Sequence, residues 1–379
     1  MTKLRLAPVD TFFFKGQQMT EAGSDSTMTG IFPPRPNTIY GALRSAFIHH
    51  HISFEEFREG THAEVKKWMG TPDKLGDFRL DYCGLYYKQE LLLPLPLDHQ
   101  VMATENDGNI AYPLSLQMDE NPSSQGSGWR LMSNRKEKTK GSANQYVKIE
   151  QWKTALLGVQ PFKDVISVNE LLEKEQKIGI ALDYNERRTK ENYLYNMTKL
   201  RFKDDGGLIV YTPNSPDFTK IPFARIGGEN RPWSIKQEQG DFSLWDSTEL
   251  EKIRQQILET KLAKLVLLSP AIWEQGSRPL TFDGTKLTLP NGIHVNWLTA
   301  AIGRPSLYGG WDIVKHRPKK RCFMVPEGSI IYISLQENQA MTIAEQVDSL
   351  LQLVNGFSLT DQGAQEGFGF AVIAAANMD

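Results

Sequence analysis

Cysteine is scarce in this sequence, and the two that are present, Cys83 and Cys322, lie far apart. They form no CxxC pair and match no spacing that is typical of metal ligands, which excludes a disulfide scaffold and a zinc ribbon. We therefore expect both cysteines to be small core residues of a protein from a reducing compartment.

An excess of charge of either sign is also lacking. The chain has 43 Lys and Arg against 45 Asp and Glu, so its net charge is -2. Because no overall basic field attracts nucleic acid, any site for a polyanion must be local.

Long hydrophobic runs are absent, since no window approaches the roughly 18 uninterrupted apolar residues of a membrane span. The opening stretch MTKLRLAPVDTFFFKG lacks the apolar centre of a signal peptide. We therefore expect a cytoplasmic protein without a membrane partner. Its 379 residues, 40% of them hydrophobic, are enough for two or three domains with buried cores.

Catalytic and metal-binding patterns are missing as well. There is no Walker lysine and no HExxH spacing. His49, His50 and His51 are adjacent, but successive residues on a helix point about 100° apart and cannot converge on one ion. The run is better interpreted as a solvated helix end, and we expect no metal and no cofactor.

The most distinctive stretch that is present is FPPRPNTIYGALRSAF, residues 32–47. Its three prolines hold the backbone extended, and Asn37 is predicted to cap a helix with Ile39 and Leu43 on its apolar face. Arg35 and Arg44 flank this helix N-terminus, which suits an anion such as a phosphate. An ordinary capped core helix with two solvated arginines is the alternative.

Two glycine-rich loops are further candidates. Gly227 and Gly228 lie between Arg225 and Arg231, a pattern that favours either a phosphate cradle or a plain tight turn. Near the C-terminus, residues 367–369 form a lone GxG without the third glycine of a dinucleotide site. This second loop predicts only that something approaches its backbone closely.

A basic segment spans residues 130–153, with two acidic residues against seven cations, namely Arg130, Arg135, Lys136, Lys138, Lys140, Lys148 and Lys153. Trp129, Tyr146 and Trp152 are interleaved with them. Cations that bind phosphates and rings that stack on bases are typical of single-stranded RNA binding. A solvated insertion with incidental charge is the alternative. The run KHRPKKR, residues 315–321, is predicted to be a basic strand end that faces a partner.

Periodicity and capping signals predict the regular elements. The apolar run 91–97 contains two prolines and is expected to be an edge or extended segment. Thr248 and Glu251 are predicted to cap a helix, as are Thr342 and Glu345. The remaining predictions are strands at 3–15, 178–182, 207–211, 262–268 and 330–334, a short helix at 169–177 and a hairpin at 183–201.

Seven pieces in one order carry a family resemblance: LAPVDTFFFKGQQM, PPRPNTIYGALRSAF, GIALDYNERRTKENYLY, IGGENRPW, LVLLSPAIWEQGSRP, VPEGSIIYISL and EGFGF. Together they resemble the RAMP superfamily of CRISPR proteins. More narrowly, they are similar to the subunit of the type III-B (Cmr) effector complex that binds the 5′ handle of the guide RNA beside the large polymerase-like subunit. One departure is Gln275-Gly276-Ser277, where many members have a second glycine-tryptophan, so a role for that turn is doubtful.

This resemblance implies an α+β fold of two tandem ferredoxin-like (RRM-like) domains. The first would span residues 1–240, with the basic insertion at about 98–153, and the second would span 241–379 and end in the glycine-rich loop. The implied function is a non-catalytic RNA-binding subunit of an antiviral complex, with guide RNA, the large subunit and neighbouring RAMP subunits as partners. The predicted RNA-binding residues are Arg35, Asn37, Thr38, Arg44, Arg130, Arg135, Lys148, Arg187, Arg188, Arg225, Gly227, Gly228, Arg231, Gly367, Phe368 and Gly369.

Two other functions stay open at this point. One is a metal-independent RAMP endoribonuclease that processes precursor guide RNA with a base from His49 to His51, although no second acid/base partner is identifiable by spacing. The other is an assembly protein whose cationic patches meet acidic partner surfaces.

Overall fold

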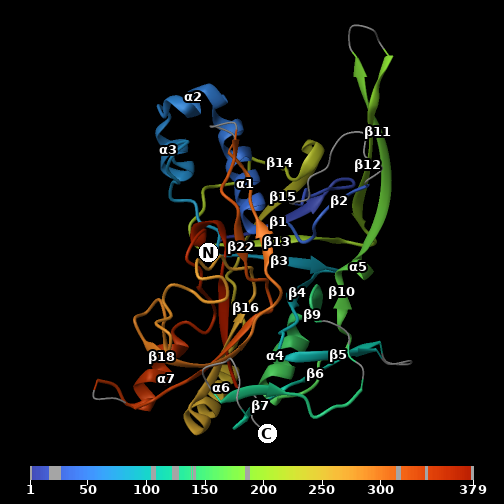
Figure 1. Ribbon diagram of the computed structural model, residues 1–379. Helices are drawn as coiled ribbons and strands as arrows, with labels where there is room; N and C mark the ends of the chain where they lie inside the picture. The colour runs from blue at the N-terminus through green and yellow to red at the C-terminus, as the bar shows by residue number, and fades with distance from the viewer. Residues whose placement is uncertain are drawn as a thin grey trace.

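The computed structural model describes residues 2–16, 27–103, 108–121, 128–137, 139, 142–183, 188–312, 317–337 and 340–376. Two large antiparallel sheets lie one above the other in Figure 1, and a long hairpin rises beside the upper sheet. Helices accompany both sheets, so the expected α+β class is confirmed. No helix in the described part of the chain is long and apolar enough to cross a membrane.

The upper sheet has eight strands in the order β10-β9-β4-β3-β13-β1-β15-β14. Their bounds are β1 (Thr2–Pro8), β3 (Tyr82–Tyr87), β4 (Glu90–Pro94), β9 (Gln145–Lys148), β10 (Ile166–Ser167), β13 (Gly206–Thr212), β14 (Phe223–Arg225) and β15 (Pro232–Gln239). β1 pairs with both β13 and β15, so that Leu4 lies opposite Val210 on one side and Gln237 on the other. The first strand of the chain is therefore held inside the sheet by strands that come much later.

Helix α1 (Pro36–His51) covers one face of the upper sheet. Its apolar side, including Ile39, Leu43 and Phe47, is buried against Leu4 and Leu6 of β1, as the periodicity predicts. Two short helices, α2 (Phe54–Glu59) and α3 (Ala63–Met69), follow its C-terminus.

The predicted cap of α1 is wrong by two residues. The helix begins at Pro36, with Arg35 in the N-cap position and no side-chain cap, whereas Asn37 is already helical. Proline suits the first helical position because its fixed φ and missing N–H cost nothing there. The backbone N–H of Thr38 is satisfied by the carbonyl of Arg35 at 2.9 Å.

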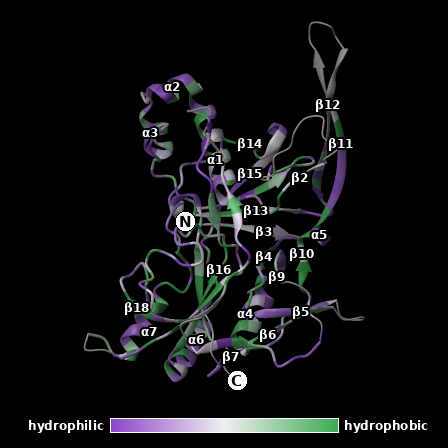
Figure 2. Ribbon diagram, in the orientation of Figure 1, coloured by the Kyte–Doolittle hydropathy of each residue, from purple (hydrophilic) through white to green (hydrophobic). Residues whose placement is uncertain are grey.

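The lower sheet has six strands in the order β17-β18-β23-β16-β25-β24. Their bounds are β16 (Leu262–Leu267), β17 (Lys286–Thr288), β18 (His294–Ala301), β23 (Ile330–Ser334), β24 (Phe357–Ser358) and β25 (Phe370–Ala375). Every residue of β16 is buried, and this strand is green in Figure 2. The helices α4 (Ile149–Gly158), α6 (Ser247–Thr260) and α7 (Ile343–Leu351) contribute buried side chains to the same core.

Four central strands follow the same order in both sheets. In β3-β13-β1-β15 and in β18-β23-β16-β25, the first strand along the chain lies between the third and the fourth, and all neighbours are antiparallel. The helical cover differs, since α1 follows the first strand of the upper set and α7 follows the third strand of the lower set. The expected boundary at residue 240 stays a prediction, with the strands of the two sheets on either side of it.

The remaining strands form ribbons outside the large sheets. Between residues 98 and 133 the ribbons pair β5 (His99–Ala103) with β6 (Asn109–Pro113) and β7 (Ser115–Met118) with β8 (Trp129–Met132). The long hairpin pairs β11 (Leu172–Asp183) with β12 (Arg188–Phe202), and β2 (Thr27–Thr29) adds a parallel strand to it. In the C-terminal half, β19 (Ser306–Tyr308) pairs with β22 (Cys322–Met324), and β20 (Trp311–Asp312) with β21 (Arg317–Pro318).

Three further element predictions need correction. The helix expected at 169–177 is only α5 (Val168–Leu171), because the ladder with β12 begins at Leu172. The cap of α6 is Asp246 with Glu249 rather than Thr248 with Glu251. The run 91–97 supplies an interior strand, since β4 pairs with both β3 and β9. The capping box of Thr342 and Glu345 at α7 is confirmed, as are the strands predicted at 178–182, 207–211, 262–268 and 330–334.

A buried polar network joins the two halves of the chain. Asp98 Oδ2 accepts hydrogen bonds from Lys264 Nζ at 2.9 Å and from Tyr332 Oη at 2.7 Å, and Asp98 Oδ1 lies 2.6 Å from His99 Nδ1. All four side chains are at most 3% exposed. Burial opposes ionisation of Asp98, yet Lys264 and His99 outweigh it and hold the pKa of Asp98 below its usual range.

Candidate nucleic-acid interface

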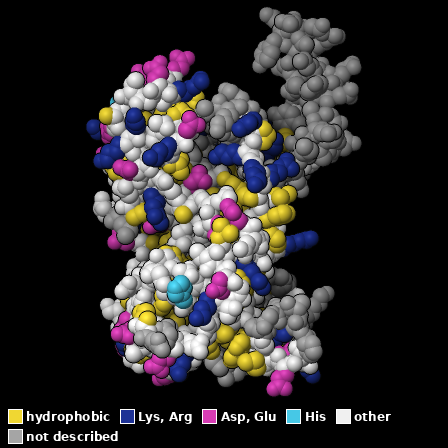
Figure 3. All heavy atoms as spheres, turned by 60° about the vertical axis from the view of Figure 1, so that its left-hand side comes forward, with side chains coloured by type: hydrophobic (Ala, Val, Ile, Leu, Met, Phe, Trp, Pro, Cys, Tyr) yellow, Lys and Arg dark blue, Asp and Glu magenta, His cyan; other side chains and the backbone are white. Residues whose placement is uncertain are grey.

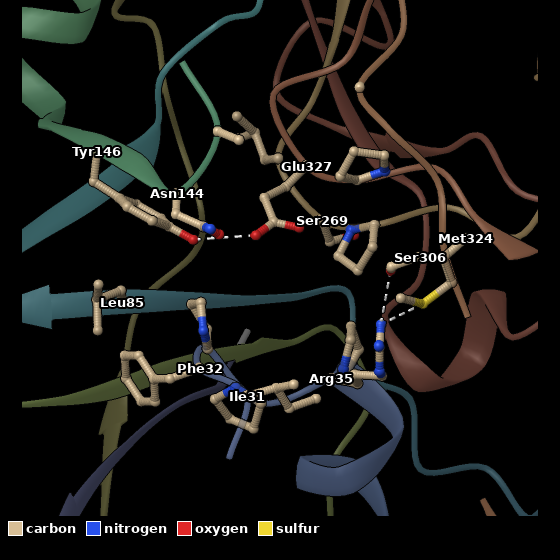
Figure 4. A pocket seen from close by; sticks show the side chains of 18 of the residues that line it. Ile31, Phe32, Arg35, Leu85, Asn144, Tyr146, Ser269, Ser306, Met324 and Glu327 are labelled. Carbon is tan, nitrogen blue, oxygen red and sulfur yellow. Dashed lines mark hydrogen bonds between the residues drawn. The ribbon is translucent and has the colours of Figure 1, made fainter. Parts of the chain in front are cut away.

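A cleft of about 760 Å³ lies between the two halves of the chain. The upper half contributes the proline-led loop at 30–36, parts of β3 and residues 142–146, and the lower half contributes residues 268–270, 301–306 and 324–327. Figure 4 shows Phe32 and Arg35 on one side of it, with Glu327, Ser269 and Ser306 across from them. The stretch singled out from the sequence thus forms one wall of this cleft.

Arg35 links this wall to the opposite one. Its Nη2 donates to the carbonyl of Leu307 at 2.9 Å, and its Nη1 lies 3.4 Å from Ser306 Oγ and 3.2 Å from Met324 Sδ. Burial lowers the pKa of Arg35 from its usual value. The guanidinium therefore braces the loop against the β19–β22 ribbon. Asn37 is half-buried, and its Oδ1 has no hydrogen-bond partner among the described residues.

A second polar pair crosses the cleft. Tyr146 Oη donates to Glu327 Oε1 at 3.2 Å, and burial raises the pKa of Tyr146. Asn144, in the left-handed region with φ 58°, lies beside this pair (Figure 4). Cys83 also lines the cleft, where burial raises the pKa of its thiol to about 12, so this cysteine is a protonated packing residue.

Arg44 lies on α1 and its guanidinium is occupied by the chain itself. Its Nε donates to the carbonyl of Met69 at 2.8 Å and its Nη2 to that of Thr71 at 2.7 Å, while the group lies 5.2 Å from the ring centre of Phe57. Burial lowers its pKa from the usual value. These contacts fix the end of α3 against α1.

The glycine pair lies at the base of the long hairpin. Gly227 has φ 83°, and a Cβ there would lie 2.5 Å from the carbonyl oxygen of Phe13, so this turn requires glycine. The approaching group is the chain's own, since the N–H of Gly228 donates to that carbonyl at 2.7 Å.

Ion pairs surround the same turn. Glu229 contacts Lys177, Lys199 and Arg231, and Arg231 also donates to Asp10 at 2.8 Å. Hydrogen bonds from Lys177 and Lys199 lower the pKa of Glu229 to about 2. The cluster fastens the hairpin to the turn. Arg225 on β14 is exposed, as is its neighbour Phe223.

The later part of the basic segment, residues 145–153, belongs to β9 and α4 of the packed fold. Trp152 is fully buried and donates its ring N–H to the carbonyl of Pro94 at 3.0 Å, and Tyr146 is 4% exposed. The prediction that these two rings stack on bases is therefore wrong, because both are core residues. Lys148 pairs with Glu90 at 2.5 Å. Arg130 lies 3.9 Å from Asp119, and exposed Arg135 stacks on Tyr112, 3.5 Å from the ring centre.

The terminal glycine-rich loop is buried and contacts both halves of the chain. Phe368 is 1% exposed and packs edge-on against Tyr308, with ring centres 5.3 Å apart. Gln365 Nε2 donates to the carbonyl of Phe78 at 2.7 Å, and the N–H of Leu80 donates to the Gln365 carbonyl at 3.0 Å. The predicted close approach is confirmed, and it is made by other parts of this chain. An RNA contact of the loop stays a prediction, although the Phe368 ring is inside the core.

The structure does not describe the side chains of two predicted RNA-binding residues, Arg187 and Arg188. Arg187 lies outside the described residues, and Arg188 begins β12 with its side chain outside them. Figure 3 shows one face of the molecule, on which Lys and Arg side chains gather in the upper half while acidic ones are scattered over both halves.

The histidine run lies at the C-terminal end of α1. With a rise of about 1.5 Å per residue, a helix of 16 residues places His49 to His51 roughly 20 Å from the end of α1 that lines the cleft. In the described part of the chain, no group of three His, Cys, Asp or Glu side chains is arranged to hold a metal ion.

Sequence reasoning missed several residues that line the cleft, among them Asn144, Arg304 and Glu327. They come from three segments that are far apart in sequence, so no spacing connects them. The turn at 325–329 was the one sequence feature that could have pointed to Glu327, because it places this carboxylate next to a predicted strand.

Comparisons with known proteins agree on one family. The model of the family described as CRISPR-associated protein (Cas_Cmr3) matches residues 4–377. The chain is 24% identical over 261 residues to the CRISPR system CMR subunit Cmr3 of Saccharolobus solfataricus, which covers 66% of this chain and 67% of that protein.

One solved structure shares the fold, with a TM-score above 0.5. A chain of the type III-B Cmr-beta complex bound to cognate target RNA and AMPPnP gives a TM-score of 0.51 at 16% identity, with 87% of this chain and 86% of that chain covered. A chain of Cmr-beta bound to cognate target RNA gives 0.49 at 17% identity, with 88% and 86% covered. Because the family model spans nearly the whole sequence, this protein belongs to the Cas_Cmr3 family of CRISPR-associated proteins.

Proposed function

We propose that this chain is a non-catalytic, guide-RNA-binding subunit of a type III-B effector complex. It holds the 5′ handle of the guide RNA and contacts the large polymerase-like subunit and neighbouring RAMP subunits. The observation that carries the proposal is the family match over residues 4–377, together with a curated relative that is named as a Cmr subunit.

The fold supports this function. The strand order shared by the two sheets fits two ferredoxin-like domains in tandem, of which the upper lacks the second helix and the lower lacks the first. RRM-type sheets bind unpaired bases rather than duplex. A cleft between two such domains, with Arg35 and Arg304 at its rim, suits a single strand that is held by its backbone and splayed bases.

The predicted RNA-binding residues divide into two roles under this proposal. Exposed side chains such as Arg225 and Arg135 contact phosphates directly. Arg44 and Arg231 are held by carbonyls and carboxylates of this chain, so they act by fixing the shape of the surface. The turn at 227–228 and the buried loop at 367–369 likewise act through contacts with other parts of this chain.

Binding of handle RNA by the purified chain tests the proposal. We expect Arg225→Ala to weaken binding and to reduce the slope of log affinity against log salt by about 0.7, the value for one phosphate contact on a single strand. Arg58→Ala, an exposed arginine of α2, is the matched control and leaves both quantities unchanged. The function is overturned if the chain binds handle RNA no better than an unrelated RNA of equal length. Equal binding by Arg225→Ala overturns the site alone.

Incubation with precursor guide RNA in the presence of a chelator tests the endoribonuclease alternative. We expect no site-specific cleavage, because the exposed histidine run lies away from the cleft. Cleavage at a defined position that disappears in a His49→Ala, His50→Ala, His51→Ala variant would establish the enzyme instead.

A further inference from the structure

The β19–β22 ribbon presents an apolar pair to solvent. Leu307 and Phe323 lie directly opposite each other in the ladder and are 41% and 56% exposed. Their neighbours Tyr308 and Met324 are 8% and 2% exposed and pack with Phe368. Successive side chains of a strand point to opposite faces, so the inner face already supplies the packing. The fold itself does not require an aromatic ring on the outer face.

Cations that form no ion pair with the described residues flank this pair along the chain. Arg304, Arg317, Lys320 and Arg321 are all exposed, and none of them makes an ion pair with any residue that the structure describes. The base of the long hairpin differs, because its cations Lys177, Lys199 and Arg231 are bound to Glu229. The charge beside the ribbon is therefore available to an external anion.

The ribbon is fixed at the rim of the interdomain cleft. Arg35 donates to the carbonyl of Leu307, and both Ser306 and Met324 line the cleft itself. Phe323 follows Cys322, which is half-buried, and precedes buried Met324. The ring consequently stands on a braced backbone beside residues that line the cleft.

We propose that Phe323 and Leu307 form a stacking platform for one or two unpaired RNA bases at the mouth of the cleft, with Arg304, Lys320 and Arg321 binding the adjacent phosphates. This inference rests on the proposed RNA-binding function and assigns it a surface. An exposed ring with flanking cations matches both parts of a single-stranded nucleotide, the base and its phosphate.

RNA is favoured over an acidic protein partner on grounds of size. Stable protein interfaces bury about 800 Å² on each partner around a central group of anchors. Two exposed side chains on a two-stranded ribbon offer much less, whereas one base needs only a single ring face.

Affinity of the full-length chain for fluorescein-labelled, single-stranded handle RNA tests the platform. Loss of one stacked base corresponds to a fall in affinity of about 5-fold to 100-fold, which we expect for Phe323→Ala. Phe323→Trp keeps the ring and binds within about 2-fold of the parent. Leu280→Ala, at a residue that is 53% exposed in the same half of the chain, is the control and leaves affinity unchanged.

The charges give a second, independent readout. Arg321→Ala is expected to reduce the slope of log affinity against log salt by about 0.7, while Phe323→Ala lowers affinity and leaves that slope in place. Because all these positions are exposed, urea unfolding should give the same midpoint for each variant as for the parent.

The outcomes distinguish a failure of the stacking platform from a failure of the proposed RNA-binding function. If the parent binds handle RNA and Phe323→Ala binds equally well, the platform is overturned and the proposed function stands. If the parent does not bind, both are overturned. If Phe323→Ala keeps its RNA affinity but fails to assemble with the large subunit, the surface belongs to a protein partner, and the platform is overturned in favour of that interface.

Discussion

Gly369 and Gly276 have nearly the same backbone conformation in very different surroundings. Their φ angles are 70° and 80°, both in the left-handed region that disfavours residues with a Cβ. A Cβ on Gly369 would lie 2.6 Å from Thr360 Cβ and 2.7 Å from the carbonyl carbon of Leu359, whereas a Cβ on Gly276 meets nothing within 4 Å. Comparing a substitution at each position therefore distinguishes the cost of the left-handed backbone from the cost of a close contact.

We expect Gly276→Ala to lower the free energy of unfolding by about 1–2 kcal/mol, the cost of the left-handed backbone. Gly369→Ala should cost about 1–3 kcal/mol more, because the neighbouring backbone has to move as well. Urea denaturation of both variants measures the difference. Equal losses would show that the loop relaxes around the added methyl group.

Single residues also show which contacts could not be predicted from the sequence. Arg231 lies beside the glycine pair as the sequence indicates, whereas the prediction that Arg44 flanks the N-terminus of the first helix is wrong, because Arg44 lies within α1. Their partners, the carbonyl of Met69 and the carboxylate of Asp10, are brought near by tertiary structure and follow no sequence spacing. Trp152 was grouped with cations that are its sequence neighbours, although it faces the core.

At the scale of elements, patterns were reliable where one period dominates. The apolar stripe of α1 and the buried run of β16 were predicted from sequence. The prolines of 91–97 led to the wrong prediction of an edge strand, because β4 is buried on both faces. Leu91 and Leu93 belong to the lower core, and Leu92 belongs to the upper one. Pro94 is the last residue of this strand, so its missing N–H interrupts no ladder.

The start of α6 offers a direct test of the corrected cap. The Asp246 carboxylate accepts a hydrogen bond from the backbone N–H of Glu249 at 2.8 Å, and the Glu249 carboxylate accepts one from the backbone N–H of Asp246. Thr248, in contrast, lies inside the helix. We expect Asp246→Ala to lower the free energy of unfolding by about 1 kcal/mol. Thr248→Ala should change it by less than about 0.5 kcal/mol. Thermal or urea unfolding compares them, and a larger effect at Thr248 would restore the cap predicted from sequence.

At the scale of the whole molecule, the network around Asp98 ties residues 98–99 to β16 and β23 of the lower sheet. Sequence could not reveal it, because Asp98 is 166 residues from Lys264 and 234 residues from Tyr332 along the chain. Removing one member of a buried ion pair leaves the other charge without compensation, which makes such a junction sensitive to protonation.

The free energy of unfolding should therefore decrease at acidic pH. Burial lowers the pKa of His99 below the value of about 6.5 that it takes in the unfolded chain. The unfolded chain then binds a proton that the folded one excludes, so stability falls as pH drops below about 6.5. The depressed pKa of Asp98 adds a further loss below about pH 4, the usual range for unfolded Asp.

Urea unfolding between pH 7.5 and 5 measures the first of these losses. We expect His99→Gln to reduce the dependence on pH and His294→Gln, at an exposed residue, to leave it unchanged. A parent chain with constant stability across this range would contradict the assignment of His99 as a buried neutral group.

The strand order of the upper sheet also governs how the protein can be made. β1 precedes every other strand of the upper sheet along the chain, but both of its partners, β13 and β15, lie within residues 206–239. The upper sheet cannot close until residue 239 has been translated, and the lower one must wait for β25 (Phe370–Ala375). During synthesis the open edges of β1 and β16 are exposed to other chains until these partner strands follow, which makes both sheets prone to wrong pairing in the nascent chain.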